Sequence, residues 1–370
     1  LVVARVALDI PMGDDGPRGR PQGCAPTKDD RIAGGDILKE IYMRHLLRRI
    51  GFYLVALWVS VTLNFLIPHL SPGNPAQALM ARMRGKVSPQ AQHALEISLG
   101  VNHDPLWSQY VQYINNLLHG NLGVSITYLP TPVTTVISQD LPWTLVLVGV
   151  ALIISFIIGT VLGIIVVWWR GSFSDVVLTP FFTFISAIPY FWLALVLLYL
   201  LGSQLSWFPI HGGYDTDNTV PGLNIDFILS AAQYAILPAL TIVVGSISGW
   251  MLGMRNTMVT TLSEDYVLMA EAKGLRPWRV MFTYAARNAI LPNITAFALS
   301  LGFVVSGSLL TEIVFSYPGI GFAILQAVDN LDYALLQGIF LVITVAVLAA
   351  NFLADLVYVL LDPRVRIERS

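Results

Sequence analysis

Charged residues are scarce in this sequence. Only 12% of the 370 residues are Asp, Glu, Lys or Arg, against about 25% in an ordinary soluble domain, and 55% are hydrophobic. The formal net charge of −2 excludes the basic surface that nucleic-acid binding requires, so no nucleic acid is expected as a partner. A single cysteine, Cys24, excludes an intramolecular disulfide and a cysteine-rich metal site. This composition indicates a chain that lies largely in a lipid membrane.

The sequence also lacks the motifs of an ATPase or a metalloenzyme. It has no phosphate-binding loop of the Walker A type, because the only Gly-Lys pair, Gly85-Lys86, is followed by Val87. It contains no His-Glu-x-x-His motif, and no nucleophile–base pair is visible. We therefore expect no catalytic residue, no metal site and no cofactor bound by this chain.

What the sequence has instead is long apolar runs. A hydrocarbon core about 30 Å thick requires roughly 20 apolar residues in a helix. Six segments meet this requirement, at approximately 46–68, 142–169, 176–202, 234–254, 289–315 and 334–361. The predicted fold class is an all-α integral membrane protein with six transmembrane helices.

Lys and Arg predict the orientation of these spans. Arginines precede the first span, follow the sixth and are frequent in the connection between the fourth and fifth, whereas residues 203–233 and 316–333 contain no Lys or Arg. Basic residues are enriched in cytoplasmic loops. We therefore expect a multi-pass protein of the plasma (cell inner) membrane with both termini in the cytoplasm.

The polar insert at 256–288, between the fourth and fifth spans, predicts two helices separated by a glycine. Ser263 is expected to cap the first helix, with Glu264 and Asp265 in its first turn, where carboxylates suit the positive end of the helix dipole. Gly274 is expected just after the helix, where a left-handed residue ends it.

The first of these helices is too short to be stable alone in water. Val267, Leu268 and Ala270 are expected to form its apolar face. This face could lie on the membrane surface or enter a groove of a partner protein, and the spacing alone leaves both open.

Other candidate residues lie in the spans. Gly159 and Gly163, four residues apart, predict a close approach of two helix backbones. An intramembrane proline bends a helix, and an intramembrane acid is a candidate functional residue. The candidates for a translocation path or gate, for which plain packing is the alternative role, are Pro189, Tyr190, Trp192, Trp250, Arg255 and Glu312.

The polar insert resembles the EAA loop of ABC-importer permeases of the oligopeptide/dipeptide/nickel class. Residues 266–275 read Tyr-Val-Leu-Met-Ala-Glu-Ala-Lys-Gly-Leu, and residues 287–292 read Arg-Asn-Ala-Ile-Leu-Pro. The resemblance extends to the Phe-Ser-Tyr-Pro-Gly-Ile-Gly turn at 315–321 and to the Asp-Pro-Arg ending at 362–364, and it covers about residues 44–366.

The resemblance implies a type I ABC-importer permease fold with a large outer loop between helices 1 and 2. Residues 1–40, which the resemblance does not cover, are rich in Gly, Pro and charge and are expected to be a disordered cytoplasmic tail. The other domains would be the first transmembrane helix with its cytoplasmic lead-in at 41–68, an extracytoplasmic loop subdomain at 69–141, a permease core with helices 2–6 at 142–363, which contains the cytoplasmic coupling loop 256–288, and a cytoplasmic tail at 364–370. Within the outer loop, two amphipathic helices are expected near 88–95 and 105–114.

The resemblance also implies partners and a coupling site. The partners would be a second homologous permease subunit, two ATP-binding subunits that use ATP and Mg, and an extracytoplasmic substrate-binding protein. The residues that would couple to the ATP-binding subunits are Glu264, Asp265, Tyr266, Ala270, Glu271, Ala272, Lys273, Gly274 and Leu275.

The cargo stays open at this point. Peptides are the default for the class, oligosaccharides are an alternative because Leu252 occupies a position that is often arginine in peptide permeases, and nickel chelates are a third. An ion-coupled secondary transporter is the alternative of a different class, and it would require buried coupling acids near the middle of the membrane.

Overall fold

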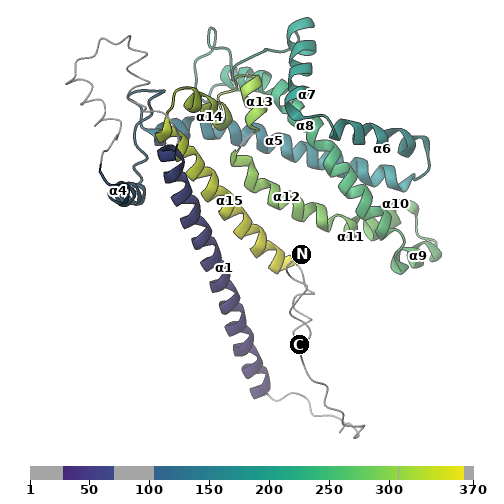
Figure 1. Ribbon diagram of the computed structural model, residues 1–370. Coiled ribbons are helices and arrows are strands. Elements are labelled where there is room, and N and C mark those ends of the chain that lie inside the picture. The colour runs from purple at the N-terminus through teal and green to yellow at the C-terminus, as the bar shows by residue number, and fades with distance from the viewer. Residues whose placement is uncertain (1–27, 71–103, 307, 362–370) are drawn as a thin grey trace, which may run out of the picture. The chain divides into compact units, whose positions relative to one another are not determined.

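The structure, a computed structural model, describes residues 28–70, 104–306 and 308–361, with side chains over 48–70, 104–173, 175–305 and 308–353 (Figure 1). In these ranges the chain is helical apart from its connections and one isolated bridge between Val124 and Pro132. Contacts divide the chain into two units, residues 1–52 and 53–370.

The helices, in chain order, are α1 Lys28–Leu70, α4 Leu106–Leu118, α5 Val133–Trp168, α6 Phe173–Ser186, α7 Tyr190–Leu197, the π-helix η1 Leu198–Gln204, α8 Ile225–Thr261, α9 Asp265–Ala272, α10 Pro277–Arg279, the π-helix η2 Val280–Ala286, α11 Arg287–Ala289, α12 Leu291–Phe303, the 3₁₀ turn η3 Val304–Ser306, α13 Leu309–Val314, α14 Ile320–Asp329 and α15 Tyr333–Leu361.

The described part of the first unit is the beginning of α1. This helix starts at Lys28, so residues 28–40 are helical where the sequence predicted a disordered tail. Residues 1–27 of the predicted tail, like the predicted tail at 364–370, lie outside the described residues.

Four helices in the described ranges are long and apolar enough to cross a membrane. They are Arg48–Leu70, Val133–Trp168, Ile225–Thr261 and Tyr333–Leu353, and they correspond to the first, second, fourth and sixth predicted spans. α5 and α8 begin at Val133 and Ile225, well before the predicted starts at 142 and 234. Each helix contains a proline in its interior, Pro142 in α5 and Pro238 in α8.

The third predicted span, 176–202, is broken. Asp175–Ser186 and Tyr190–Gln204 are apolar enough to cross together, but they meet at an angle of 100°. Proline has no N–H to donate and disfavours the helical conformation in the residue before it. Pro189 is accordingly the N-cap of α7, with φ −59° and ψ 140°, and the expected bend at this proline is confirmed.

The fifth predicted span is also divided, and here the expectation of one helix over 289–315 is wrong. α12 covers 13 residues, a 3₁₀ turn follows, and α13 is a separate helix of 6 residues. α12 ends at Phe303, the 3₁₀ turn covers Val304–Ser306, and α13 begins at Leu309. By length and composition the described residues therefore give four crossing helices, or five if the bent pair is counted as one.

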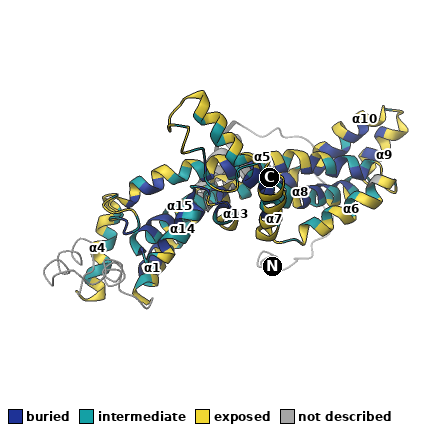
Figure 2. Ribbon diagram, turned by 90° about the horizontal axis from the view of Figure 1, so that it is seen from above, coloured by how far each residue is buried: buried dark blue, intermediate teal, exposed yellow. Residues whose placement is uncertain are grey.

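α5 and α8 form the centre of the second unit, and buried residues run along both (Figure 2). They approach closely at two glycines, as predicted. A Cβ atom on Gly159 would lie 2.7 Å from the carbonyl oxygen of Ile247, and one on Gly163 would lie 2.6 Å from that of Met251. Any side chain at these positions would push the two backbones apart.

The segment predicted to form the outer loop, 69–141, is described at residues 69–70 and from residue 104 onward. α4 confirms the predicted amphipathic helix near 105–114, and the one near 88–95 lies outside the described residues. Tyr110 of α4 shares a hydrogen bond of 2.9 Å with Thr62 of α1. Asn64 of α1 donates at 2.7 Å to the carbonyl oxygen of Gln337 in α15.

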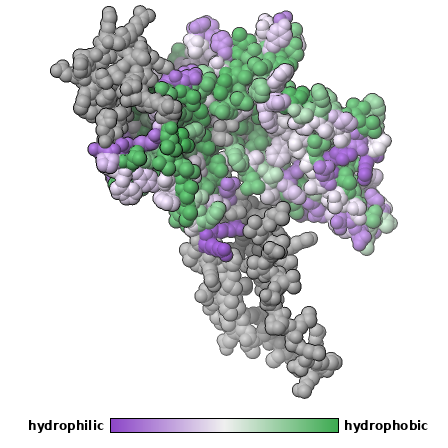
Figure 3. Space-filling view, viewed as in Figure 1, coloured by the Kyte–Doolittle hydropathy of each residue, from purple (hydrophilic) through white to green (hydrophobic). Residues whose placement is uncertain are grey.

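The surface is apolar over the middle of the helices. Ile153, Ile157 and Val161 project from α5 and are exposed. In Figure 3 the hydrophobic colour dominates there, and hydrophilic colours gather toward the end that holds α9 and α10. This distribution fits helices that face lipid, with a polar region beyond them.

Candidate functional site

The polar insert begins with a tight turn after α8. Ser263 does not cap α9, because its hydroxyl donates at 2.7 Å to the carbonyl oxygen of Thr260 and so belongs to the end of α8. Glu264 is the N-cap instead, through its backbone, and Asp265 occupies the first turn as predicted. The prediction therefore located the helix correctly and was wrong about the cap.

The end of α9 follows the prediction. Gly274 has φ +71°, a left-handed conformation that favours glycine. Its N–H donates to the carbonyl oxygen of Glu271 at 2.8 Å, and the N–H of Leu275 donates to that of Ala270 at 3.4 Å. These two bonds form a Schellman motif, which stops the helix after Lys273.

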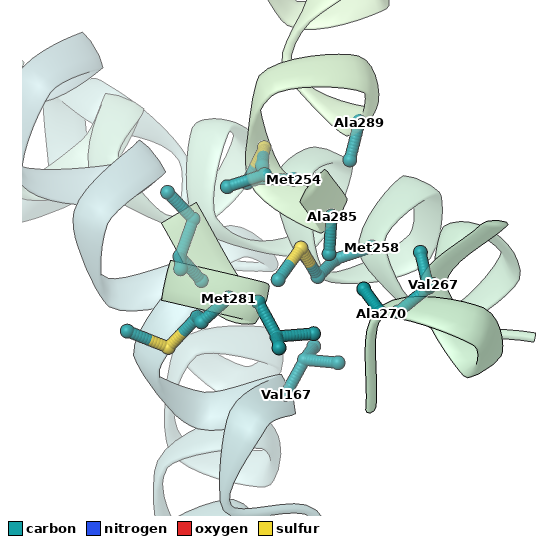
Figure 4. Packing of buried hydrophobic residues seen from close by; sticks show 11 residues of the cluster. Val167, Met254, Met258, Val267, Ala270, Met281, Ala285 and Ala289 are labelled. Atoms are coloured by element: carbon teal, nitrogen blue, oxygen red, sulfur yellow. The ribbon is translucent and has the colours of Figure 1, made fainter. Parts of the chain in front are cut away.

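α9 is anchored on its own chain. Val267 and Ala270 are buried and face Met254, Met258 and Met281 (Figure 4). We call this group the methionine cluster, and it consists of Ile164, Val167, Met254, Met258, Val267, Ala270, Val280, Met281, Ala285, Ala286 and Ala289. Methionine side chains adapt to irregular surfaces, and three of them fill the space between α9 and its neighbours in this cluster.

A π-helix supplies part of this cluster, and the sequence reasoning did not foresee it. In η2 the pairs Val280–Ala285 and Met281–Ala286 are each five residues apart, and all four residues are buried. A π-helix repeats its contacts at i and i+5. The wide turn therefore directs two adjacent pairs into the cluster, where an α-helix would turn one residue of each pair away.

The other face of α9 is exposed. Leu268 and Met269 are 52% and 59% exposed, so Leu268 does not share a face with the buried Val267 and Ala270, with which the sequence analysis had grouped it. Of the nine residues predicted to couple, Ala270 is buried and Leu275 is half-buried. The others share the exposed surface of this segment: Glu264, Asp265, Tyr266, Glu271, Ala272, Lys273 and Gly274.

Arg255, a candidate for the translocation path, is held in an ion pair. Its Nη2 lies 3.1 Å from Oδ1 of Asp175, and its Nε lies 3.3 Å from the same oxygen. Thr179 also donates to this oxygen at 2.9 Å. The pair joins α8 to the beginning of α6. Asp175 was missed, although it is the only acid in an otherwise apolar helix, which was a usable signal.

Of the three aromatic candidates, Tyr190 packs against α8 and Trp250 belongs to α8. The ring of Tyr190 packs over Gly245, where an added Cβ would lie 2.4 Å from Cε1, and its hydroxyl lies 3.3 Å from that of Ser246. Trp250 contacts Phe156 and Phe297, while Trp192 is largely exposed. Over the described residues, no side-chain hydrogen bond, ion pair or ring contact joins any two of the six path candidates.

Glu312 is fully buried and caps a helix. Its Oε2 accepts from the N–H of Gly321 at 2.6 Å, and its Oε1 accepts from the hydroxyl of Thr144 at 3.1 Å. Thr144 in turn accepts from the N–H of Ile320 at 2.8 Å. The N-cap of α14, Gly319, has no side chain, so Glu312 supplies the acceptor that this helix start requires. Its position therefore indicates a structural clamp between α13, α14 and α5.

Asp332 is a second buried carboxylate, and the sequence reasoning missed it. It accepts from the hydroxyl of Ser125 at 2.5 Å, from the N–H of Thr127 at 2.9 Å and from the N–H of Leu335 at 3.0 Å. It therefore caps α15 and ties the segment before α5 to it. An Asp directly before an apolar run is a helix-capping signal.

Comparisons with known proteins agree with this architecture. Residues 159–367 match the family described as binding-protein-dependent transport system inner membrane component. The chain is 35% identical over 336 residues to the di/tripeptide transport system permease protein DppB of Pseudomonas aeruginosa, covering 87% of this chain and 98% of that protein. It is 32% identical over 323 residues to the oligopeptide transport system permease protein AppB of Bacillus subtilis (87% and 98%), and 34% identical over 330 residues to the probable D,D-dipeptide transport system permease protein DdpB of Escherichia coli (85% and 95%). The chain thus belongs to the family of inner membrane components of binding-protein-dependent transport systems.

Proposed function

We propose that this chain is the transmembrane permease subunit of an ATP-driven, binding-protein-dependent importer and forms half of the translocation path for di- and oligopeptides. The relatives over nearly the full length are named as permeases for dipeptides, tripeptides or oligopeptides, which favours peptides over oligosaccharides and nickel chelates.

The observation that carries the proposal is the two-sided packing of α9. Its inner face is fixed in the methionine cluster through Val267 and Ala270, and its outer face presents Leu268 and Met269 among charged residues. An apolar centre with a charged rim is the composition of a protein interface. We infer that this outer face contacts an ATP-binding subunit and transmits its movement to α5 and α8.

The partners follow from what the chain lacks. No phosphate-binding loop occurs in the sequence, so we propose that this chain is a transport subunit without an enzymatic role or a bound cofactor, and that ATP and Mg are used by partner subunits. We propose two ATP-binding subunits, an extracytoplasmic substrate-binding protein and a second homologous permease subunit as the assembly.

We further propose the six-span topology of type I permeases. The bent pair α6 and α7–η1 would form the third span, and α12 with α13 the fifth. Residues 69–141 would form the extracytoplasmic loop, and both termini would lie in the cytoplasm. The distribution of Lys and Arg supports this orientation.

For the translocation path we propose the aromatic residues near the break before α7, namely Tyr190 and Trp192, together with Trp250 and the bend at Pro189. Arg255 and Glu312 would act indirectly. Their side chains are occupied by Asp175 and by the start of α14, so they would hold α6, α8 and α14 in the positions that shape the path.

A charge placed on the exposed face of α9 tests the coupling role. Leu268→Glu and Met269→Glu should fold normally, because both side chains are exposed. Each should reduce copurification of the ATP-binding subunits and ATP-driven uptake of a labelled dipeptide into vesicles, by roughly thirtyfold if the residue is a hot spot of about 2 kcal/mol.

Val220→Glu is the matched control, since Val220 is also an exposed apolar residue but lies in the loop before α8. It should leave copurification of the ATP-binding subunits unchanged. Full retention of these subunits by both α9 variants would refute the coupling role, and uptake by the purified chain alone, driven by an ion gradient, would refute the importer.

A further inference from the structure

We propose that the turn after α5 and the beginning of α10–η2 form a binding surface for the headgroups of anionic phospholipids. We call it the Trp–Arg surface, and it consists of Trp169, Arg170, Arg276, Trp278, Arg279 and Phe282. This inference goes beyond the proposed function, because it holds whatever the chain transports.

The first half of this surface lies where the chain leaves and re-enters its apolar helices. α5 is apolar to Trp168 and ends at Trp169. Gly171, with φ +79°, turns the chain, and α6 begins at Phe173 with further apolar residues. A turn of this length between two apolar helices lies at the boundary between the hydrocarbon core and water.

The second half comes from a distant part of the sequence and lies at the same level. The rings of Trp169 and Trp278 meet edge to face, with centroids 6.3 Å apart. Trp278 stacks on Phe282, with centroids 5.8 Å apart and ring planes 6° from parallel. Val280 and Met281, between these two rings in sequence, are buried in the methionine cluster. The opposite face of the same helix therefore carries the aromatic rings.

These rings remain exposed: Trp169 by 47%, Trp278 by 60% and Phe282 by 45%. Tryptophan concentrates at the headgroup level of membranes, where its apolar ring and its N–H group both find partners. Three contiguous exposed rings beside the end of a spanning helix therefore match the interfacial zone of a bilayer better than an aqueous surface.

The charges beside the rings give the preference for anionic lipid. Arg170, Arg276 and Arg279 are exposed, and over the residues whose side chains are described none of them forms a salt bridge. Arg255, by contrast, is neutralised by Asp175. Each basic residue at the membrane surface adds attraction to anionic headgroups. The three guanidinium groups therefore complement a phosphate-bearing, negatively charged leaflet.

The test uses the full chain reconstituted into phosphatidylcholine vesicles that contain brominated phosphatidylglycerol or, in parallel, brominated phosphatidylcholine. Bromine quenches the fluorescence of nearby tryptophans. The fluorescence of Trp169 and Trp278 is obtained by subtracting the signal of a double variant, Trp169→Phe/Trp278→Phe, from that of the unsubstituted protein. We expect half-maximal quenching at a lower fraction of phosphatidylglycerol than of phosphatidylcholine. Each single variant, Arg170→Gln, Arg276→Gln or Arg279→Gln, should raise that fraction of phosphatidylglycerol about fivefold. A triple Gln variant, with all three arginines replaced, should lose the preference.

Arg287→Gln is the matched control. Arg287 is exposed on the same stretch of helix, and no ring contact involving it occurs among the described residues, so its loss should leave the preference unchanged. Equal quenching by the two lipids, or an unaltered preference in the triple Gln variant, would overturn the proposal. Quenching by neither lipid would also overturn it and would assign the rings to a protein partner.

Discussion

Glu312 illustrates how one buried side chain can hold three helices. Its carboxylate accepts from Gly321 at the start of α14 and from Thr144 of α5, while its own backbone belongs to α13. Space for the carboxylate exists because residues 319 and 321 are glycines, where a Cβ would lie 2.4 Å and 2.9 Å from Oε2. The local sequence Gly-Ile-Gly is therefore matched to an acid seven residues before it.

Removing this acceptor should destabilise the protein. Glu312→Ala leaves the N–H of Gly321 and the hydroxyl of Thr144 without a partner in a buried position, at a cost of about 1–3 kcal/mol for each unsatisfied group. Glu312→Gln retains one acceptor oxygen and should lose less. The measurement is the thermal unfolding midpoint in detergent, with Glu271→Ala, on the exposed face of α9, as a control expected to match the unsubstituted protein. A midpoint unchanged by Glu312→Ala would contradict the clamp.

At the scale of elements, α5 and α8 form the most extensive helix pair among the described residues, and their close approach depends on two glycines. Gly159 and Gly163 place the backbone of α5 directly on that of α8. The methionine cluster lies at the end of the same contact, since it contains residues of α5, α8, α9 and η2. If α9 couples to an ATP-binding subunit as proposed, its displacement would reach this helix pair first.

Alanine substitutions separate close packing from helix propensity. Gly163→Ala would bring a Cβ within 2.6 Å of the carbonyl oxygen of Met251, so we expect a loss of roughly 1–3 kcal/mol from overpacking. Gly249→Ala, in α8, meets no atom within 4 Å and should be neutral or stabilising by up to about 1 kcal/mol. Unfolding by a denaturing detergent would measure both, and an equal effect at the two sites would argue against the close contact.

For the whole molecule, the proposed topology separates two segments that the structure presents to solvent. The loop at 205–224 contains the exposed Val220 and is ordered by Asp215, which accepts from the side chain and N–H of Asn218 and from the N–H of Asp217. These hydrogen bonds hold the pKa of Asp215 below its usual range. α9, with the exposed Leu268, would lie on the opposite side of the membrane.

Single cysteines test this arrangement. Cys24 is the only native cysteine, so Cys24→Ser provides a thiol-free background. Val220→Cys should react with a membrane-impermeant maleimide in intact cells, and Leu268→Cys should react only after permeabilisation. The native Cys24, which lies outside the described residues, should also resist labelling in intact cells. The reverse pattern at Val220 and Leu268 would invert the topology.

Sequence patterns alone were enough to predict the class of the protein and several local features. Apolar runs of more than about 20 residues require a membrane, and four of them are single long helices. Gly274, Pro189, Gly159 and Gly163 behave as predicted because each acts through its own backbone or its lack of a side chain. The motif in residues 266–275 indicated the family, which the comparisons establish.

Only the tertiary structure decided which side chains meet. Three pairs that meet in the structure lie at least 80 residues apart in the sequence: Asp175 with Arg255, Trp169 with Trp278, and Thr144 with Glu312. No local pattern predicts such pairings. The separation of Leu268 from the buried face of α9 and the division of the fifth span were likewise not foreseen. Periodicity in sequence gives the period of a helix, whereas the face that is buried, and the point where a helix breaks, depend on the neighbours that fold against it.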